Sequence, residues 1–175
     1  MTKIINYKTN QVIIEDDNLS LKELVEKAVK NNISLAYANL QYANLEGANL
    51  EKADLRYANL EKADLRYADL ENANLEDANL YNANLKNATL ESAKLENADL
   101  FEANLYNANL YKANLGYANL ENADLQDAYL FNVNLKNANL EYANIENANL
   151  KYANLKYANL EKADLYKANL EKATF

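Results

Sequence analysis

From residue 36 to residue 175 the apolar residues of this chain recur with a period of five. The segment divides into 28 consecutive pentapeptides without an insertion or deletion, since 140 residues divided by five gives 28. The fifth position is Leu in 26 blocks, except Ile145 and Phe175, and the third is Ala in 27 blocks, except Val133. The fourth position is Asn or Asp in 24 blocks; the exceptions are Thr89, Lys94, Tyr129 and Thr174. The first two positions are variable and mostly polar.

A period of five fits neither a single helix nor a single strand. On an α-helix, which turns about 100° per residue, successive leucines would spread over every side. On one continuous strand they would alternate between the two faces. Both conflicts disappear if the chain turns a corner every five residues, so that Ala and Leu point inward and the other three positions point outward. Four corners close one coil, and the pattern therefore predicts an all-β solenoid of about seven four-sided coils.

The repeated residues also predict how each coil is filled. Each buried Leu contributes about 2 kcal/mol of hydrophobic stabilisation. The small Ala fits a narrow interior that leaves no room for a ligand. The Asn/Asp column suits a backbone rich in turns, because these side chains hydrogen-bond to nearby backbone groups. The chain contains only two glycines, so we expect turns that need a positive φ to be uncommon.

Residues 1–35 lie outside the repeat and differ from it in composition. Two apolar-rich runs, Lys3–Tyr7 and Gln11–Glu15, predict a β-hairpin. Ser20 and Glu23 have the spacing of a capping box, and the apolar stripe after them predicts an α-helix over about 20–31. A solenoid needs its open end covered, so we expect this hairpin and helix to form an N-terminal cap within one structural domain. The alternative is that the helix binds a partner.

The residue inventory excludes most catalytic chemistry. The chain has no Cys and no His, and so it offers no thiol nucleophile, no imidazole base and no zinc site of the usual kind. We therefore expect no enzymatic activity, no catalytic residue, no cofactor and no metal site. The acidic run at residues 15–18 lacks the spacing of a calcium loop. No apolar run approaches the ~20 residues needed to cross a bilayer, and we expect a cytoplasmic protein that does not act on membranes.

The repeated triplets, such as Ala38-Asn39-Leu40 and Ala53-Asp54-Leu55, resemble those of the pentapeptide repeat protein family. The resemblance covers 140 of the 175 residues in one unbroken register. It implies a right-handed quadrilateral β-helix. It also implies a homodimer as one possible assembly, because family members often pair through the C-terminal coil. Phe175 replaces Leu in the last block, which makes it the candidate contact of such a dimer.

Charge is distributed unevenly along the repeats. The net charge of −8 arises there, with nine acids and four bases in residues 36–85, seven and three in 86–135, and five and six in 136–175. An acidic rod does not suit direct binding to nucleic acid. We expect a non-enzymatic scaffold or protein–protein interaction module with an unknown protein partner. The family resemblance implies an alternative, a DNA mimic that binds DNA gyrase or another type II topoisomerase. Adjacent Glu-Lys pairs favour a role in solubility over mimicry.

Several outward positions carry aromatic residues. Residues twenty apart should lie on neighbouring coils, so Tyr81 should stack on Phe101 and Tyr111 on Phe131, with Tyr106 on the face between them. Exposed apolar patches often mark interfaces, and these five residues form a candidate aromatic belt for binding a partner. The alternative, which we favour, is that the stacked rings only stabilise the outer columns of the solenoid.

Overall fold

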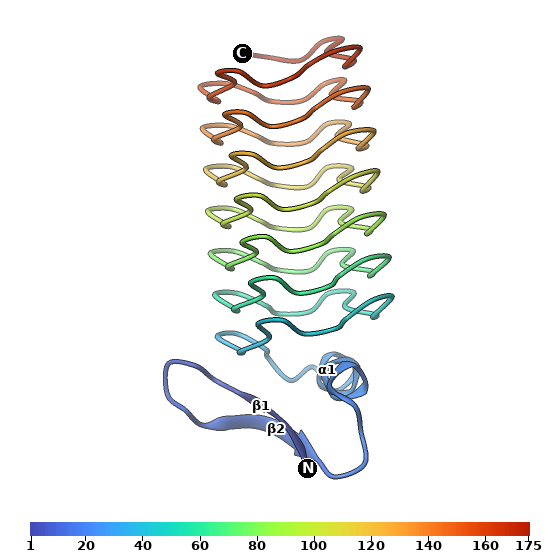
Figure 1. Ribbon diagram of the computed structural model, residues 1–175, viewed down its shortest axis with the longest axis vertical. Coiled ribbons are helices and arrows are strands. Elements are labelled where there is room, and N and C mark those ends of the chain that lie inside the picture. Colours follow the sequence, from blue (N-terminus) through green and yellow to red (C-terminus); the bar gives the residue numbers. More distant parts are fainter.

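The computed structural model describes residues 1–175 and shows a long coil with a hairpin and a helix at its N-terminal end (Figure 1). Strand β1 spans Thr2–Ile5 and pairs antiparallel with strand β2, Val12–Asp16. Helix α1 spans Leu21–Lys30. Each element lies within a residue or two of its predicted position. The chain then winds away from α1, so that the two termini lie at opposite ends of the molecule (Figure 1).

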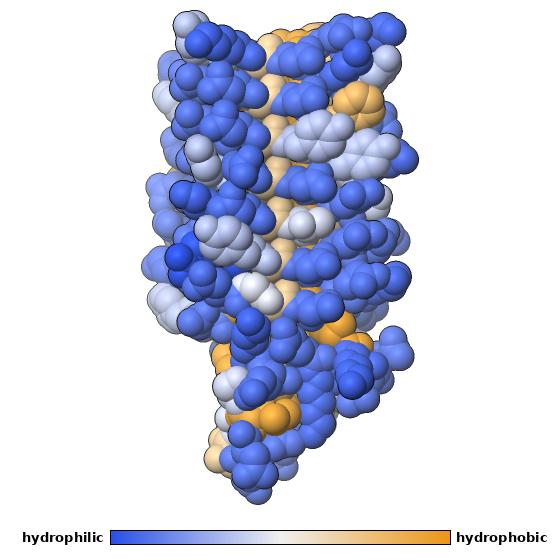
Figure 2. Space-filling model, turned by 90° about the vertical axis from the view of Figure 1, so that its right-hand side faces the viewer, coloured by the Kyte–Doolittle hydropathy of each residue, from blue (hydrophilic) through white to orange (hydrophobic).

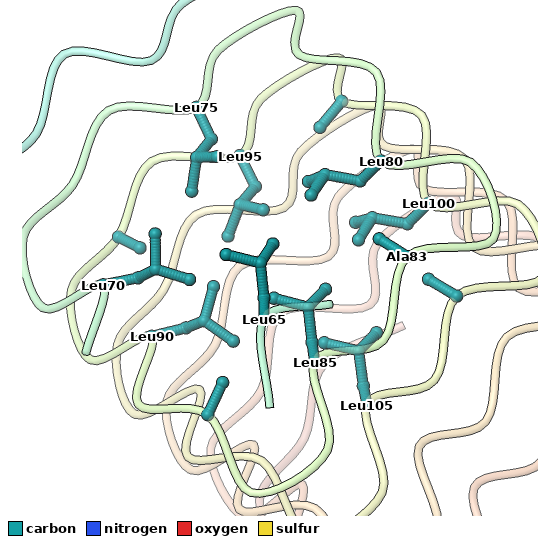
Figure 3. Close-up of a cluster of buried hydrophobic side chains, with 14 of the residues drawn as sticks. Leu65, Leu70, Leu75, Leu80, Ala83, Leu85, Leu90, Leu95, Leu100 and Leu105 are labelled. Carbon is teal, nitrogen blue, oxygen red and sulfur yellow. The ribbon is translucent and has the colours of Figure 1, made fainter. Parts of the chain in front are cut away.

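Each coil contains twenty residues, because the fourth position of a pentapeptide forms a parallel bridge with the same position twenty residues later. One such pair is Asn79 and Asp99. In Figure 3, leucines of one coil enter the interior from four sides: Leu65, Leu70, Leu75 and Leu80. Leu85 repeats the position of Leu65 in the next coil. The interior is one apolar cluster of 53 buried residues, and no polar side chain is buried.

The repeat satisfies every backbone N–H of a pentapeptide. In the block 106–110 the third N–H closes a turn at 3.0 Å, the second and fifth donate to the next coil at 2.9 and 2.8 Å, and the fourth donates to the preceding coil at 3.0 Å. The remaining N–H, that of Tyr106, donates to the side chain of Asn104 at 2.9 Å. This side-chain bond follows all 24 Asn and Asp residues of the column. The predicted backbone role of the Asn/Asp column is confirmed.

The expectation about positive φ is wrong. The second residue of each pentapeptide has a φ between 53° and 64°, and only Gly47 among them is a glycine. Positive φ at the third residue of a four-residue turn is what a type II turn requires. The position is occupied mainly by Asn, Tyr and Lys, and never by a β-branched residue. Asn tolerates this conformation better than most residues, and the three hydrogen bonds to adjacent coils hold the others in it.

The N-terminal elements pack onto the first coil. Helix α1 begins with the predicted capping box: the Ser20 hydroxyl accepts from the Glu23 N–H at 3.3 Å, and the Ser20 N–H donates to the Glu23 carboxylate at 2.8 Å. Leu24 of α1 is fully buried. The carbonyl of Ile5 in β1 accepts from the N–H of Asn39 at 2.9 Å. Backbone groups at the edge of the first coil therefore have partners in the hairpin.

The other end of the coil is less buried. From residue 156 onward the inward Ala and Leu side chains are only partly buried. Phe175 is 68% exposed. The last twenty residues have coil neighbours on one side only, because no bridge joins them to a further coil.

An ion pair near the first coil allows a test of electrostatic stabilisation. The Asp54 carboxylate accepts from the Arg56 guanidinium at 2.7 and 2.9 Å and from the Ser34 hydroxyl. These bonds, the Arg56 bond foremost, lower the pKa of Asp54 from 3.8 to about 2. The carboxylate thus stabilises the fold above its unfolded-state pKa, and this stabilisation is lost as the pH falls through the folded-state value.

We expect Asp54→Asn to lower the free energy of unfolding by about 1 kcal/mol at neutral pH, allowing for solvent screening. Asn retains one acceptor oxygen, which can still accept from Arg56 Nε, but the charge interaction and the bonds that Oδ2 accepts from Arg56 and Ser34 are lost. Urea denaturation of both proteins at pH 7, 4 and 2 would measure the effect. The difference should shrink below the ordinary Asp pKa and be mostly lost at pH 2, where about half of the folded molecules have a protonated Asp54; a constant difference would show that the charge is not its cause.

Candidate interaction surface

The filled interior confines any binding site to the outer surface. Three open hollows lie where α1 meets the first coils. The largest is lined by Val29 and by polar residues, Glu26, Lys30, Asn32, Asn49, Glu51 and Lys52. No group of three or more acidic residues stands close enough to hold a metal ion. The single helix is too short and too polar to cross a bilayer.

The five predicted aromatic residues form two separate stacks and one isolated ring. The rings of Tyr81 and Phe101 are parallel, with centroids 5.5 Å apart, and those of Tyr111 and Phe131 are tilted by 36° at 5.8 Å. The stacks lie on opposite sides of the coil, since they are displaced by half of its twenty residues. Tyr106 contacts no other aromatic ring. All five side chains are half-buried rather than fully exposed.

Tyr106 instead takes part in polar contacts. The ammonium of Lys86 lies 4.8 Å from the centroid of its ring. A hydrogen bond with the carboxylate of Asp127 raises the pKa of Tyr106. Phe175 stands alone at the C-terminal end of the coil. The structure therefore does not bring Tyr106 or Phe175 into contact with either stack.

The stack of Tyr111 and Phe131 is larger than the sequence indicated. The ring of Tyr129 lies 6.1 Å from that of Tyr111 and 6.0 Å from that of Phe131. The ring of Tyr152 meets Phe131 edge to face at 5.2 Å. These four residues, Tyr111, Tyr129, Phe131 and Tyr152, are named the aromatic cluster below. Tyr129 and Tyr152 are 41% and 39% exposed, so the cluster is accessible to solvent in part.

Two signals in the sequence mark the members that were missed. Tyr129 occupies the Asn/Asp column, where a large aromatic side chain cannot provide the usual backbone bond. Tyr152 follows Phe131 by 21 residues, one coil plus one position, and therefore lies diagonally above it. A search for contacts at intervals of twenty alone overlooks such diagonal neighbours.

Lysine side chains border the aromatic cluster. The ammonium of Lys112 lies 4.7 Å from the ring centroid of Tyr111. Those of Lys151 and Lys172 lie 5.3 and 5.2 Å from the ring centroid of Tyr152. Cation–π contacts of this kind hold charged groups beside apolar rings. On one side of the molecule, Figure 2 shows paler and orange side chains that interrupt the blue columns of the C-terminal half.

Other charged groups are engaged within the fold. The Arg66 guanidinium pairs with Asp64 at 2.6 Å and with Glu46 on the neighbouring coil at 2.8 Å. In the acidic run before α1, the carboxylate of Asp16 accepts from Lys27 at 2.6 Å, which lowers the pKa of Asp16. These pairs bind parts of the chain to one another.

The residues that break the Asn/Asp column leave a backbone group without its usual partner. No side-chain bond reaches the N–H two residues after Thr89, Lys94 or Tyr129. A typical hydrogen bond contributes about 1 kcal/mol. Thr89 and Tyr129 both lie on the side of the coil that carries the aromatic cluster. The other two departures, Lys94 and Thr174, lie on the adjacent side.

The sequence matches the family of pentapeptide repeats, with eight copies found between residues 33 and 175. The matched segments are 33–66, 63–100, 90–127, 103–141, 128–165 and 143–175. The chain therefore belongs to the pentapeptide repeat family. Proteins of this family form right-handed quadrilateral β-helices, which agrees with the four-sided coil and the twenty-residue register observed here.

Solved structures of the same family resemble the chain. The pentapeptide repeat protein Rfr23 from the cyanobacterium Cyanothece 51142 is 42% identical over 53% of this chain and 63% of its own, with a TM-score of 0.52. HetL, a pentapeptide repeat protein involved in heterocyst differentiation regulation from Nostoc sp. strain PCC 7120, is 34% identical over 80% of this chain and 79% of its own, with a TM-score of 0.39. No curated protein sequence matches the chain. Because the match covers 63% of the Rfr23 chain, this chain spans less than two thirds of the length of Rfr23.

The breaks in the Asn/Asp column allow a test of the backbone bond. We expect Thr89→Asn to raise the free energy of unfolding by about 1 kcal/mol, because it supplies the missing acceptor. Tyr129→Asn supplies the same bond but removes two ring contacts, and should gain about 1 kcal/mol less than Thr89→Asn. Chemical denaturation of the two variants and the wild type would measure both changes. Equal gains would mean that the ring contacts of Tyr129 contribute nothing to stability.

Proposed function

We propose that this pentapeptide repeat protein is a non-enzymatic scaffold or protein–protein interaction module. The observation that carries this proposal is the filled apolar interior, which confines all variable side chains to the outside of a regular coil. Residues 1–35 act as a lid on a β-helix of seven coils built from residues 36–175. The aromatic cluster and its lysines are the most distinctive part of the surface, and partner binding by such patches is common.

Four surface variants would test this function, one for each side of the coil. In each variant the first-position residues of three central coils on one side are replaced by Asn, which leaves the inward Ala and Leu unchanged. Proteins captured by the wild type from its source cells are purified, and their dissociation constants are measured against all four variants. We expect one side alone to weaken a given partner by at least tenfold. Melting temperatures should fall modestly for the two sides that lose an aromatic stack and stay close to the wild type for the others. Binding that is insensitive to every side would contradict the proposal.

A second candidate function is a DNA mimic that binds DNA gyrase or another type II topoisomerase. The acidity of residues 36–135 favours it, since this part of the coil carries 16 acids and 7 bases (nine plus seven, and four plus three). In this function the last coil forms a homodimer contact. The partial exposure of its inward side chains and the exposed ring of Phe175 support that contact.

A DNA supercoiling assay with purified gyrase would test the mimic. We expect inhibition by the wild type at micromolar concentrations, and weaker inhibition by Phe175→Ser if the end-to-end dimer is required. Light scattering of the wild type and of Phe175→Ser would show whether a change in inhibition accompanies a change from dimer to monomer. No inhibition of gyrases from several bacteria would remove this candidate and leave the scaffold.

A further inference from the structure

One side of the coil is basic in its C-terminal half, although the protein as a whole is acidic. This part of the surface, named the lysine strip, consists of the outward residues of pentapeptides 111–115, 131–135, 151–155 and 171–175 and of the corner residues 116–117, 136–137 and 156–157. Residues 111–175 contain seven lysines and eight acids. Five of the lysines lie on the strip: Lys112, Lys136, Lys151, Lys156 and Lys172. Only one of the eight acids, Glu171, lies there, so the strip has a net charge of +4 (five minus one) and the rest of the segment has −5 (two minus seven).

Most lysines of the strip have no carboxylate partner within the chain. Lys151 alone forms an ion pair, with Glu171 at 2.8 Å. Of the eight other basic residues in the coil, five pair with an acid: Lys52, Arg56, Lys62, Arg66 and Lys162. The four remaining lysines of the strip are exposed: Lys112, Lys136, Lys156 and Lys172. Their ammonium groups are therefore free to meet carboxylates from another molecule.

The Asn column along the middle of the strip adds hydrogen-bond donors. Asn134 donates to Oδ1 of Asn114 at 2.7 Å, and Asn154 donates to Oδ1 of Asn134 at 3.1 Å. Each donating amide has a second N–H, which has no partner within the chain. Each of the three amide oxygens already accepts two bonds, one of them from the backbone N–H two residues later. The column therefore offers donors to a ligand but no free acceptor, which suits carboxylate groups.

Acidic residues on the next corner in either direction limit the width of an anionic ligand. One corner carries Glu121, Glu141 and Glu161, and the other carries Asp127 and Glu146. One side of the coil is five residues wide, which is at most about 17 Å of extended chain. A double-stranded nucleic acid, whose major groove alone is about 12 Å wide, would bring phosphates close to these acids. The strip therefore suits a single extended chain.

The aromatic rings beside the strip favour a peptide over a single-stranded nucleic acid. Proteins hold single strands by stacking bases on free aromatic faces. The ring of Tyr152 has the ammonium groups of Lys151 and Lys172 at 5.3 and 5.2 Å from its centroid. The ammonium of Lys112 likewise lies 4.7 Å from the ring centroid of Tyr111. These rings are occupied by cations, but they still provide apolar contact area for side chains of a peptide.

We propose that the lysine strip binds an extended acidic segment of a partner protein. In this complex the carboxylates contact Lys136 and Lys156 on one edge of the strip and Lys112 and Lys172 on the other. Lys112 and Lys172 are three coils apart, a distance of about 14 Å that corresponds to about four residues of extended chain. This inference rests on the proposed interaction role and deepens it by naming the chemistry of the partner.

The exposure of the lysines sets the expected strength. Each contact between exposed charges contributes little, and salt screens it. The segment that the strip can hold is also short. Binding should therefore be weak for an isolated peptide and strongly dependent on salt.

Fluorescence anisotropy of a labelled peptide with the whole chain would test this binding. The probe is a synthetic octapeptide of six Asp and Glu residues and two Phe residues, and the control peptide has Asn and Gln in place of the acids. At low salt we expect the acidic peptide to bind with a dissociation constant in the micromolar to submillimolar range, and the neutral peptide to bind at least tenfold more weakly. Raising the salt to about 0.2 M should weaken the acidic peptide about tenfold. Equal binding of the two peptides would overturn the inference.

A matched pair of double variants tests where the peptide binds. Lys136→Glu with Lys156→Glu reverses two charges of the strip, whereas Lys86→Glu with Lys167→Glu reverses two charges on the diagonally opposite corner of the coil. Both variants have the same net charge, so a nonspecific attraction would weaken equally in both. We expect the strip variant to raise the dissociation constant at least tenfold and the control variant less than about threefold. Equal losses would overturn the inference, and circular dichroism melting verifies that both variants fold.

Two further measurements separate an acidic segment from other occupants of the strip. A labelled single strand of eight thymidine nucleotides should bind at least tenfold more weakly than the acidic peptide; tighter binding would assign the strip to nucleic acid instead. Analytical ultracentrifugation of the wild type and of the strip variant should give the same oligomeric state. A dimer that the strip variant loses would assign the strip to a second copy of the chain.

Failure of the acidic peptide to bind the wild type would overturn this inference without removing the proposed function. A scaffold can bind its partner through another side of the coil, which the four surface variants test separately.

Discussion

Hydrogen bonding between coils is the constraint on which the rest of this structure depends. Three of the five N–H groups in each pentapeptide donate to a neighbouring coil, one closes the turn, and one donates to an Asn or Asp side chain. Backbone groups near an apolar interior cannot be left unpaired without loss of stability. This constraint explains the period of five. After each corner, the second, fourth and fifth residues must lie opposite their hydrogen-bond partners on the neighbouring coils. The identity of the fourth residue follows as well, since only a short side chain with an acceptor oxygen reaches the remaining N–H.

The same constraint separates the inside of the molecule from its outside. Ala and Leu fill the interior so completely that the inward side chains from Leu35 to Leu155 are at most 3% exposed. Substitutions at the first and second positions leave these contacts and most of the backbone bonds intact. The outer surface is therefore an array of positions with few constraints from the fold, chiefly the positive φ of the second position. Part of its pattern of charge and aromatic rings serves contacts between neighbouring coils, such as the Arg66–Glu46 pair and the Tyr81–Phe101 stack.

Sequence periodicity was sufficient to predict the interior, but not the conformation of the turns or the contacts between outward side chains. The Leu and Ala columns follow from burial, and the capping box of Ser20 and Glu23 follows from local spacing. The positive φ of the second residue was missed because the scarcity of glycine was taken as evidence against it. Three bonds to adjacent coils hold each corner in this conformation, so residues other than glycine can adopt it. Tyr152 was missed for a geometric reason: its contact with Phe131 runs diagonally between coils, and an interval of twenty does not reveal it. The half-burial of the aromatic residues likewise depends on neighbours one coil away.

Departures from a strict repeat are more informative here than the repeat itself. Thr89, Lys94 and Tyr129 each forgo a backbone bond that 24 other residues of the column provide, and the interior gains nothing from the change. Thr89 and Tyr129 lie on one side of the coil, and Lys94 lies on the adjacent side together with Thr174, the fourth departure from the column. Each departure gives up a local backbone bond, and at Tyr129 the structure shows what replaces it, namely the ring contacts with Tyr111 and Phe131.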